Sequence, residues 1–140
     1  MKNPSKPVLL VEDDDVDAMT VKRALKDLRV TNPLAHTLNG EEALQYLRNE
    51  ENKKPCIILL DLNMPRMNGI EFMQALKVDD KLRKIPIVVL TTSREERDKL
   101  ESFKLGAAGY MLKGIDYKNF VEIIRTISLY WTLSELPDGQ

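Results

Sequence analysis

The sequence is poor in several residues on which common functions depend. It contains one cysteine, Cys56, so no internal disulfide can form, and we expect a protein of the reducing cytoplasm. Its one histidine, His36, leaves no basis for a histidine-dependent catalytic triad or an internal phosphohistidine. No apolar run approaches the ~18 residues of a membrane span, and the first residues lack the apolar region of a signal peptide. A net charge of −1 argues against nucleic acid as a partner.

Length and composition indicate a single globular domain. The chain has 140 residues, 43% hydrophobic and 31% charged, without repeats or low-complexity linkers. We expect one domain over residues 1–140, with a core over about 6–133 and a short C-terminal tail.

Three short runs consist entirely of apolar residues, at 8–11, 57–60 and 87–90. Uninterrupted runs of this length are typical of parallel strands buried on both faces. Weaker patterns predict two further strands, at 34–38 and 109–112.

The segments between these runs have helical spacing. Ala18, Val21 and Leu25 are one example, and further helices are predicted from about residue 40, over 69–78 and 95–105, and from 117 past 131. In the highly charged helix at 95–105, only Leu100, Phe103 and Leu105 are available for burial. Five strands alternating with five helices predict a doubly wound, flavodoxin-like α/β domain, a three-layer sandwich with strand order 2-1-3-4-5.

Reactive side chains follow four of the predicted strands, and the carboxyl ends of parallel strands share one edge of the sheet. That edge collects Glu12, Asp13, Asp61, Thr91 and Lys113. Three carboxylates in one cleft repel each other, and a divalent cation with oxygen ligands resolves the conflict, so we expect Mg²⁺, with Mn²⁺ as the alternative. A carboxylate, a metal, an ammonium and a hydroxyl together suit a transferring phosphoryl group.

On these residues, the chain over about 6–135 resembles the receiver domains of two-component response regulators. An acidic pair follows the first strand, and Asp61, Thr91 and Lys113 follow the third, fourth and fifth. Thr91 lies 30 positions after Asp61 and Lys113 lies 22 after Thr91, spacings that the family shares. The run from Leu62 to Pro65 and the long aromatic last helix resemble in particular the single-domain regulators that partner phytochrome-type histidine kinases.

The resemblance implies a role for each residue at the sheet edge. Asp61 accepts a phosphoryl group from a kinase phosphohistidine. Asp13 binds Mg²⁺ directly, Glu12 assists through water, and Asn63 offers its backbone carbonyl to the metal.

Further roles in the resemblance belong to binding and switching. Thr91 and Lys113 hold the phosphoryl oxygens, and Tyr110 changes rotamer when Thr91 moves. The surface of the fourth helix, fifth strand and fifth helix carries the signal. The protein would therefore be a signalling protein that catalyses its own phosphorylation and dephosphorylation, rather than an enzyme. Because no DNA-binding segment follows, we expect no direct transcriptional role.

The chain departs from the family at Gly114, where most receivers have proline after the lysine, often in a cis bond. We expect a trans bond here, because a cis bond before glycine costs ~2.5–4 kcal/mol. The departure leaves open a binding module of the same fold that acts without phosphorylation. A haloacid-dehalogenase-type phosphatase is a second alternative, but its nucleophile follows the first strand.

The last helix has more apolar residues than one buried face needs. Phe120, Ile123, Ile124, Ile127 and Trp131 form the predicted inner stripe. Outside it lie Val121, Leu129, Tyr130 and Leu133. Such a surplus indicates an interface, so we expect a homodimer or a kinase-docking surface here, with coverage by the tail at 134–140 as the alternative.

Overall fold

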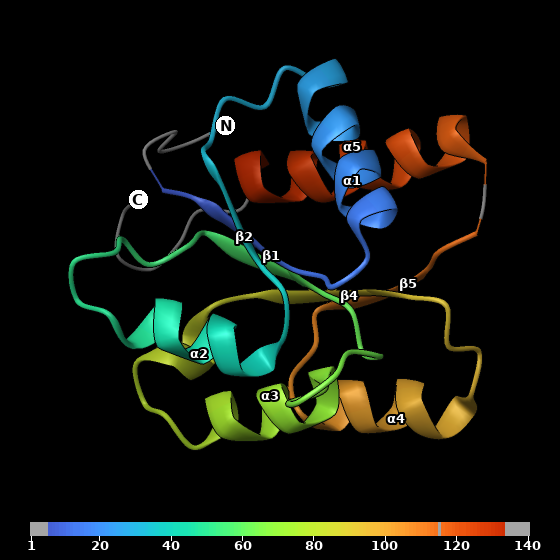
Figure 1. The fold of residues 1–140 in the computed structure, drawn as a ribbon. Coiled ribbons are helices and arrows are strands. Elements are labelled where there is room, and N and C mark those ends of the chain that lie inside the picture. The colour runs from blue at the N-terminus through green and yellow to red at the C-terminus, as the bar shows by residue number, and fades with distance from the viewer. Residues whose placement is uncertain (1–5, 115, 134–140) are drawn as a thin grey trace.

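The computed structural model describes residues 6–114 and 116–133, except for the side chains of 130–133. Five parallel strands form one sheet in the order β2-β1-β3-β4-β5 (Figure 1). The strands are β1 (Val8–Val11), β2 (Leu34–Thr37), β3 (Ile57–Leu60), β4 (Ile87–Thr91) and β5 (Gly109–Leu112). The predicted strands, their order and the fold class are therefore confirmed.

Five helices in the described part of the chain cover the sheet. They are α1 (Asp15–Asp27), α2 (Gly40–Arg48), α3 (Gly69–Lys77), α4 (Glu96–Lys104) and α5 (Tyr117–Leu133). A short 3₁₀ turn, η1 (Leu82–Lys84), lies between α3 and β4. Helices α1 and α5 lie on one face and α2, α3 and α4 on the other, which gives the predicted three layers (Figure 1).

The central strands are buried on both faces because alternate side chains point to opposite sides of a sheet. In β1, Leu9 and Val11 join the core beneath α2 and α3, whereas Val8 and Leu10 join the core beneath α1 and α5. All four β1 residues are buried, which matches the prediction from its uninterrupted apolar run.

Helix α4 buries a different face from the one predicted. Leu100 and Phe103 are 58% and 45% exposed, whereas Ser102 is fully buried. The Ser102 hydroxyl donates a 2.8 Å hydrogen bond to the Asp98 carbonyl, so this polar group is satisfied inside the helix. A small residue on the inner face lets α4 lie close to its neighbours. The prediction was therefore wrong for Leu100 and Phe103, while Leu105 does pack partly against the core.

Helix α5 follows the predicted inner stripe in its described part. Phe120, Ile124 and Ile127 are buried and Ile123 is partly buried, whereas Leu129 is 52% exposed. The side chains of Trp131, Tyr130 and Leu133, and the tail at 134–140, lie outside the described residues. Within the described part of the chain, no helix combines the length and apolar character that crossing a membrane requires.

Candidate functional site

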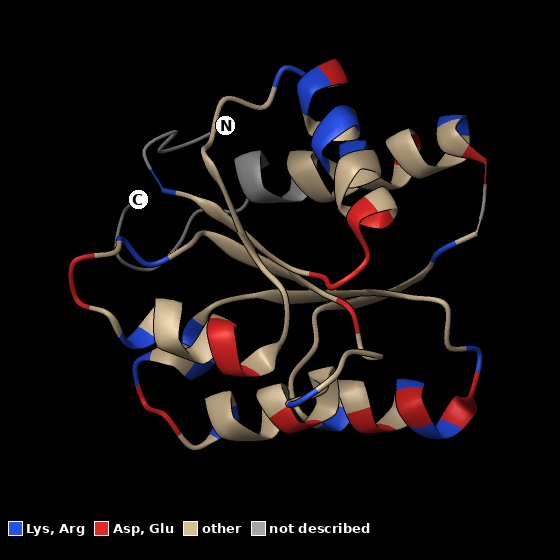
Figure 2. Ribbon diagram, in the orientation of Figure 1, with Lys and Arg blue, Asp and Glu red and all other residues tan. Residues whose placement is uncertain are grey.

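The predicted acidic residues lie together where β1 and β3 end. One carboxylate oxygen from each of Glu12, Asp13 and Asp61 lies within 4.8 Å of the others. Glu12 and Asp61 are buried and Asp13 is exposed. The Asp61 backbone N–H donates a 3.0 Å hydrogen bond to the Val11 carbonyl, which fixes the end of β3 beside β1. Figure 2 shows the acidic segments that follow β1 and β3 at one edge of the sheet.

One carboxylate oxygen of Asp61 indicates which kind of ligand this cluster can bind. Asp61 Oδ1 is buried and has no hydrogen-bond partner among the described residues. An unpaired buried carboxylate oxygen is costly, and a divalent cation with oxygen ligands would satisfy it. The three carboxylates therefore fit such an ion, with Asp13 on the solvent side.

The Lys113 ammonium lies against this cluster from the end of β5. Its Nζ is 2.5 Å from Glu12 Oε1, 2.8 Å from Asp17 Oδ2 and 3.5 Å from Asp61 Oδ2. Its backbone N–H donates a 2.8 Å hydrogen bond to the Thr91 carbonyl, which extends the pairing of β5 with β4. Burial lowers the pKa of Lys113, but the hydrogen bonds to Asp17 and Glu12 and the charge of Asp61 outweigh it, so the pKa is raised. Lys113 therefore stays a cation.

The pKa of Glu12 is raised to about 7, mainly because burial disfavours its charged form. The hydrogen bond from Lys113 opposes this shift, and the charge of Asp61 adds to it. The crowding of carboxylates that the sequence predicted is thus present at the site.

Thr91 is fully buried as the last residue of β4. Its Oγ1 accepts a 3.3 Å hydrogen bond from the Ser93 backbone N–H. The Ser93 hydroxyl donates to Asp98 at 2.6 Å, and the Tyr110 hydroxyl donates to the Ser93 carbonyl at 2.9 Å. Ser93 therefore links the two residues predicted to switch, Thr91 and Tyr110.

The loop after β3 approaches Asp61 closely. A Cβ added to Gly69 would lie 2.6 Å from the Asp61 carbonyl oxygen, so a side chain cannot fit at the start of α3 without movement. Asn63 is exposed in this loop, and the role of its carbonyl as a metal ligand remains a prediction. His36 Nε2 lies 2.7 Å from the Glu12 carbonyl, to which it donates, so it supports the backbone as an ordinary strand residue.

Gly114 adopts φ +88°, and the Lys113–Gly114 bond is trans, as predicted. Proline, with φ fixed near ~−65°, cannot take this conformation. The departure from the family's usual sequence thus corresponds to a different local backbone after Lys113.

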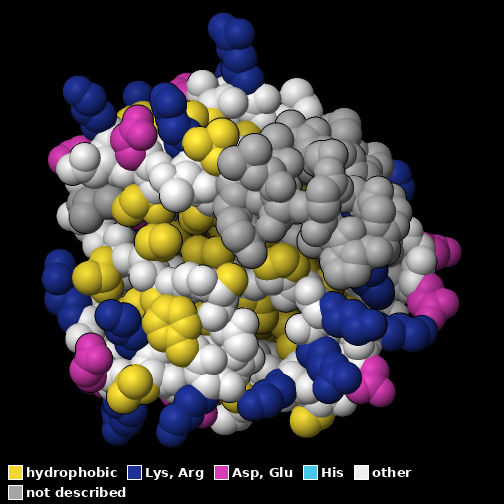
Figure 3. Space-filling model, turned by 180° about the vertical axis from the view of Figure 1, so that it is seen from behind, with side chains coloured by type: hydrophobic (Ala, Val, Ile, Leu, Met, Phe, Trp, Pro, Cys, Tyr) yellow, Lys and Arg dark blue, Asp and Glu magenta, His cyan; other side chains and the backbone are white. Residues whose placement is uncertain are grey.

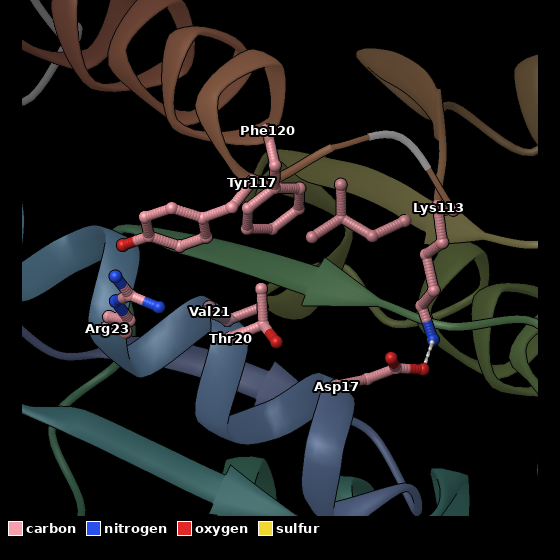
Figure 4. Close-up of a pocket in the computed structure, with 9 residues that line it drawn as sticks. Asp17, Thr20, Val21, Arg23, Lys113, Tyr117 and Phe120 are labelled. Atoms are coloured by element: carbon pink, nitrogen blue, oxygen red, sulfur yellow. Dashed lines mark hydrogen bonds and ion pairs between the residues drawn. The ribbon is translucent and has the colours of Figure 1, made fainter.

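Sequence reasoning missed Asp17, which contacts Lys113 from α1. A pocket of about 340 Å³ opens beside this ion pair, between α1 and the start of α5 (Figure 4). The Arg23 guanidinium lies 4.1 Å from the centroid of the Tyr117 ring at the pocket wall. Helical spacing alone could have placed Asp17 in the first turn of α1 near the sheet edge, but it gives no indication that the side chain turns toward Lys113.

Comparison with known proteins agrees with this geometry. The family model described as the response regulator receiver domain matches residues 8–125. Response regulator Rcp1 of Synechocystis sp. is 35% identical over 133 residues, which cover 92% of this chain and 90% of Rcp1. The phosphorylated cyanobacterial phytochrome response regulator RcpA has a TM-score of 0.87 and 34% identity, covering 95% of this chain and 99% of RcpA.

The Mn²⁺-bound form of Rcp1 has a TM-score of 0.85 at 34% identity and covers 94% of this chain and 99% of that structure. The similarity to these proteins in fold and in sequence extends over almost the whole described chain. The chain therefore belongs to the response regulator receiver domain family, the signalling modules of two-component systems that histidine kinases phosphorylate on an aspartate.

Proposed function

We propose that Asp61 is the phosphoacceptor of this receiver domain and that Mg²⁺ is its metal. The observation that carries the proposal is the state of Asp61 Oδ1, a buried oxygen without a partner among the described residues. It belongs to a carboxylate beside two further acids and 3.5 Å from an ammonium. A buried carboxylate in these surroundings can bind a metal ion through one oxygen and form a new bond through the other.

In the proposed reaction, an Asp61 oxygen forms a bond to phosphorus while the bond from phosphorus to the kinase imidazole nitrogen breaks. The electron pair of that bond returns to the imidazole. Lys113 and the Thr91 hydroxyl hold the phosphoryl oxygens, as oriented donors stabilise developing charge.

Glu12, Asp13, Asp61 and the carbonyl of Asn63 would hold Mg²⁺. When bound, that ion neutralises charge on the transferring group. The same residues support self-catalysed phosphorylation from small donors and slow dephosphorylation by water.

Intact mass after incubation with acetyl phosphate tests this assignment. We expect a gain of about one phosphoryl mass (~80 Da) that requires Mg²⁺, disappears with chelator and is absent in Asp61→Asn. The Asp13→Asn variant should still be phosphorylated on Asp61, but only at a much higher Mg²⁺ concentration. A phosphoryl group that persists in Asp61→Asn would refute the assignment.

The histidine kinase partner that we propose is of the phytochrome type, and the site of action is the cytoplasm. The supporting observation is that RcpA, a phytochrome response regulator, matches this chain over 95% of its length. Phosphotransfer from a panel of purified kinases tests this proposal. Transfer from a phytochrome-type kinase at least about tenfold faster than from the other kinases is expected, and equal rates would contradict it.

The exposed part of α5 supports a homodimer. Leu129 is exposed, and Val121 is only partly buried. Seen from behind, hydrophobic side chains gather on the face that includes β5 and α5 (Figure 3). Light scattering with and without beryllofluoride should give a dimer mass that Leu129→Glu reduces to a monomer. A monomer under both conditions would exclude this interface.

A further inference from the structure

The Lys113 ammonium contacts three carboxylates. The distances from Nζ are 2.5 Å to Glu12, 2.8 Å to Asp17 and 3.5 Å to Asp61. Hydrogen bonds to Glu12 and Asp17 use two of the three donors of this ammonium, and the ion pair with Asp61 is longer. A phosphoryl oxygen that approaches Lys113 therefore competes with these carboxylates. The side chain of Lys113 is only 12% exposed, so the carboxylates compensate most of its charge.

Asp17 differs from the other two partners of Lys113. It is not part of the acidic cluster at the strand ends, which consists of Glu12, Asp13 and Asp61. It lies in the first turn of α1, and its side chain is 39% exposed. A metal ion in the acidic cluster would share the oxygens of Glu12 and Asp61, but it would leave the contact between Asp17 and Lys113 intact.

Capping of α1 does not explain the orientation of the Asp17 side chain. In α3, the acid at the third helical position, Glu71, accepts a hydrogen bond from the backbone N–H of the N-cap residue Asn68. Asp17 holds the same position in α1, after the N-cap residue Asp14. There, the Asp14 N–H donates to Glu12 Oε2 instead, and the Asp17 carboxylate turns to Lys113, as Figure 4 shows.

We propose that Asp17 is a positioning residue that holds Lys113 in the unphosphorylated protein and competes with the phosphoryl oxygens for its ammonium. The inference rests on the proposed function of Asp61. Asp17 thus sets part of the energetic difference between the two states of the domain, because its ion pair must weaken when Lys113 turns to the phosphoryl group. A carboxylate on α1 in this way influences how long the signal persists.

The test uses Asp17→Asn with Asp15→Asn as the matched control. Both residues are acids in the first turn of α1, so both changes remove one charge at the same helix end. Asp15 is exposed and makes no ion pair or side-chain hydrogen bond among the described residues. Thermal unfolding verifies that both variants are folded.

The main measurement is the affinity for beryllofluoride, a non-covalent phosphoryl mimic, in the presence of Mg²⁺. We expect Asp17→Asn to bind it about 2- to 5-fold more tightly than the wild type, the range that a partly exposed ion pair provides. Asp15→Asn should bind it with unchanged affinity. In a Lys113→Gln background, Asp17→Asn should have no effect, because no ammonium remains to be released.

The lysine ammonium resonance of Lys113 gives a readout that needs no phosphoryl group. Asp17→Asn should shift it in the metal-free protein, whereas Asp15→Asn should not. A purely structural role for Asp17 would lower stability without raising affinity.

The two possible failures are distinguishable. If the wild type binds neither beryllofluoride nor a phosphoryl group, the proposed function of Asp61 fails, and the competition fails with it. If the wild type binds beryllofluoride but Asp17→Asn matches Asp15→Asn or binds more weakly, the role of Asp17 alone is overturned.

Discussion

The Tyr110 hydroxyl donates a 2.9 Å hydrogen bond to the carbonyl oxygen of Ser93. The backbone N–H of the same serine donates to Thr91 Oγ1 at 3.3 Å. The residue proposed to bind a phosphoryl oxygen is therefore connected to an aromatic side chain on the outer strand through one residue. If Thr91 turns toward a phosphoryl group, Ser93 loses one of its contacts, and Tyr110 is the side chain that can respond.

Removing this hydroxyl should loosen the β4–α4 connection. Tyr110→Phe is expected to lower the free energy of unfolding by about 1 kcal/mol, the usual net value of a hydrogen bond. It should also accelerate amide hydrogen exchange around Ser93. Urea unfolding and exchange mass spectrometry measure the two effects.

Tyr46→Phe is the control, because Tyr46 is also partly buried and its hydroxyl has no hydrogen-bond partner among the described residues. It should alter neither quantity. Equal effects of the two substitutions would mean that the Tyr110 contact is not specific.

Repulsion within the acidic cluster should lower the free energy of unfolding when chelator removes any bound metal. Asp61 and Glu12 are buried near Asp13, and Lys113 is a single compensating cation. We expect repulsion among the acids to exceed the attraction of Asp61 to Lys113, since several negative charges face one positive charge. Asp61→Asn should therefore raise the free energy of unfolding in chelator by about 1–2 kcal/mol, measured by urea titration.

With Mg²⁺ added, the wild type should gain more stability than Asp61→Asn, because binding to the native state stabilises it. Asp80→Asn, whose side chain is 90% exposed, is the control and should show a change below about 0.5 kcal/mol. A destabilised Asp61→Asn in chelator would show that the attraction to Lys113 outweighs the repulsion.

Most of this site could be predicted because strand ends are easy to locate in a sequence. The apolar runs before Glu12, Asp61 and Thr91 are continuous, and in a parallel sheet their ends must meet. The strand order and the spacing between Asp61, Thr91 and Lys113 do not depend on side-chain conformation. Both could therefore be predicted from the sequence alone.

The errors have a common physical cause, which is side-chain direction. Helix α4 contains few apolar residues, so their spacing did not reveal that Ser102 faces inward while Leu100 and Phe103 face outward. Asp17 was missed for a similar reason, because an acid in a first helical turn usually interacts with its own helix. Its contact with Lys113 depends on where α1 lies relative to the residue that follows β5.

Gly69 should be indispensable at the start of α3. Its missing side chain lets the helix lie against the Asp61 carbonyl, since a Cβ there would be 2.6 Å from that oxygen. Gly69→Ala is expected to lower the free energy of unfolding by about 1–3 kcal/mol, the usual cost of overpacking. It should also slow phosphorylation from acetyl phosphate, because the displaced backbone carries Asp61.

Gly109→Ala provides the comparison, because the nearest atoms to its added Cβ lie at 3.7 Å, an ordinary contact. It should leave the phosphorylation rate unchanged. If Gly69→Ala keeps the stability and the phosphorylation rate of the wild type, the loop after β3 can move to make room for the added Cβ.

Cys56 should react slowly with thiol reagents in the folded protein. Burial raises the pKa of its thiol, and the Asn32 amide lies 3.8 Å from its sulfur. Because the thiolate is the reactive form, modification at pH 8 should be at least about tenfold slower than in urea.

The same shift affects stability at high pH. The folded protein holds the thiol proton more tightly than the unfolded chain, so this contribution is present below the unfolded pKa and is lost as pH rises through the folded value. The stability difference between the wild type and Cys56→Ala should therefore shrink above pH ~9. A difference that does not depend on pH would contradict the shift.

Gly114 should control the geometry of Lys113 through its backbone alone. Among the described residues other than its two neighbours, no atom lies within 4 Å of a Cβ built on Gly114, yet its φ of +88° is unfavourable for any residue with a side chain. Gly114→Ala should therefore cost about 1–2 kcal/mol of stability. Gly114→Pro should have a larger effect, because proline cannot adopt a positive φ and must force the loop into another conformation. The hydrogen bond to the Thr91 carbonyl holds the Lys113 backbone in place. We therefore expect the change in the loop to alter the position of the Lys113 side chain and its contacts.

Beryllofluoride affinity distinguishes this local effect from a general loss of stability. Gly106 also has a positive φ, +100°, and its added Cβ would meet no described residue beyond its two neighbours, but it follows α4 rather than Lys113. Gly106→Ala should therefore lose similar stability and keep its affinity, whereas both Gly114 variants should bind the mimic less tightly than the wild type. If Gly114→Pro instead binds it more tightly, the family's usual residue at this position improves the site, and the glycine here serves to weaken the phosphorylated state.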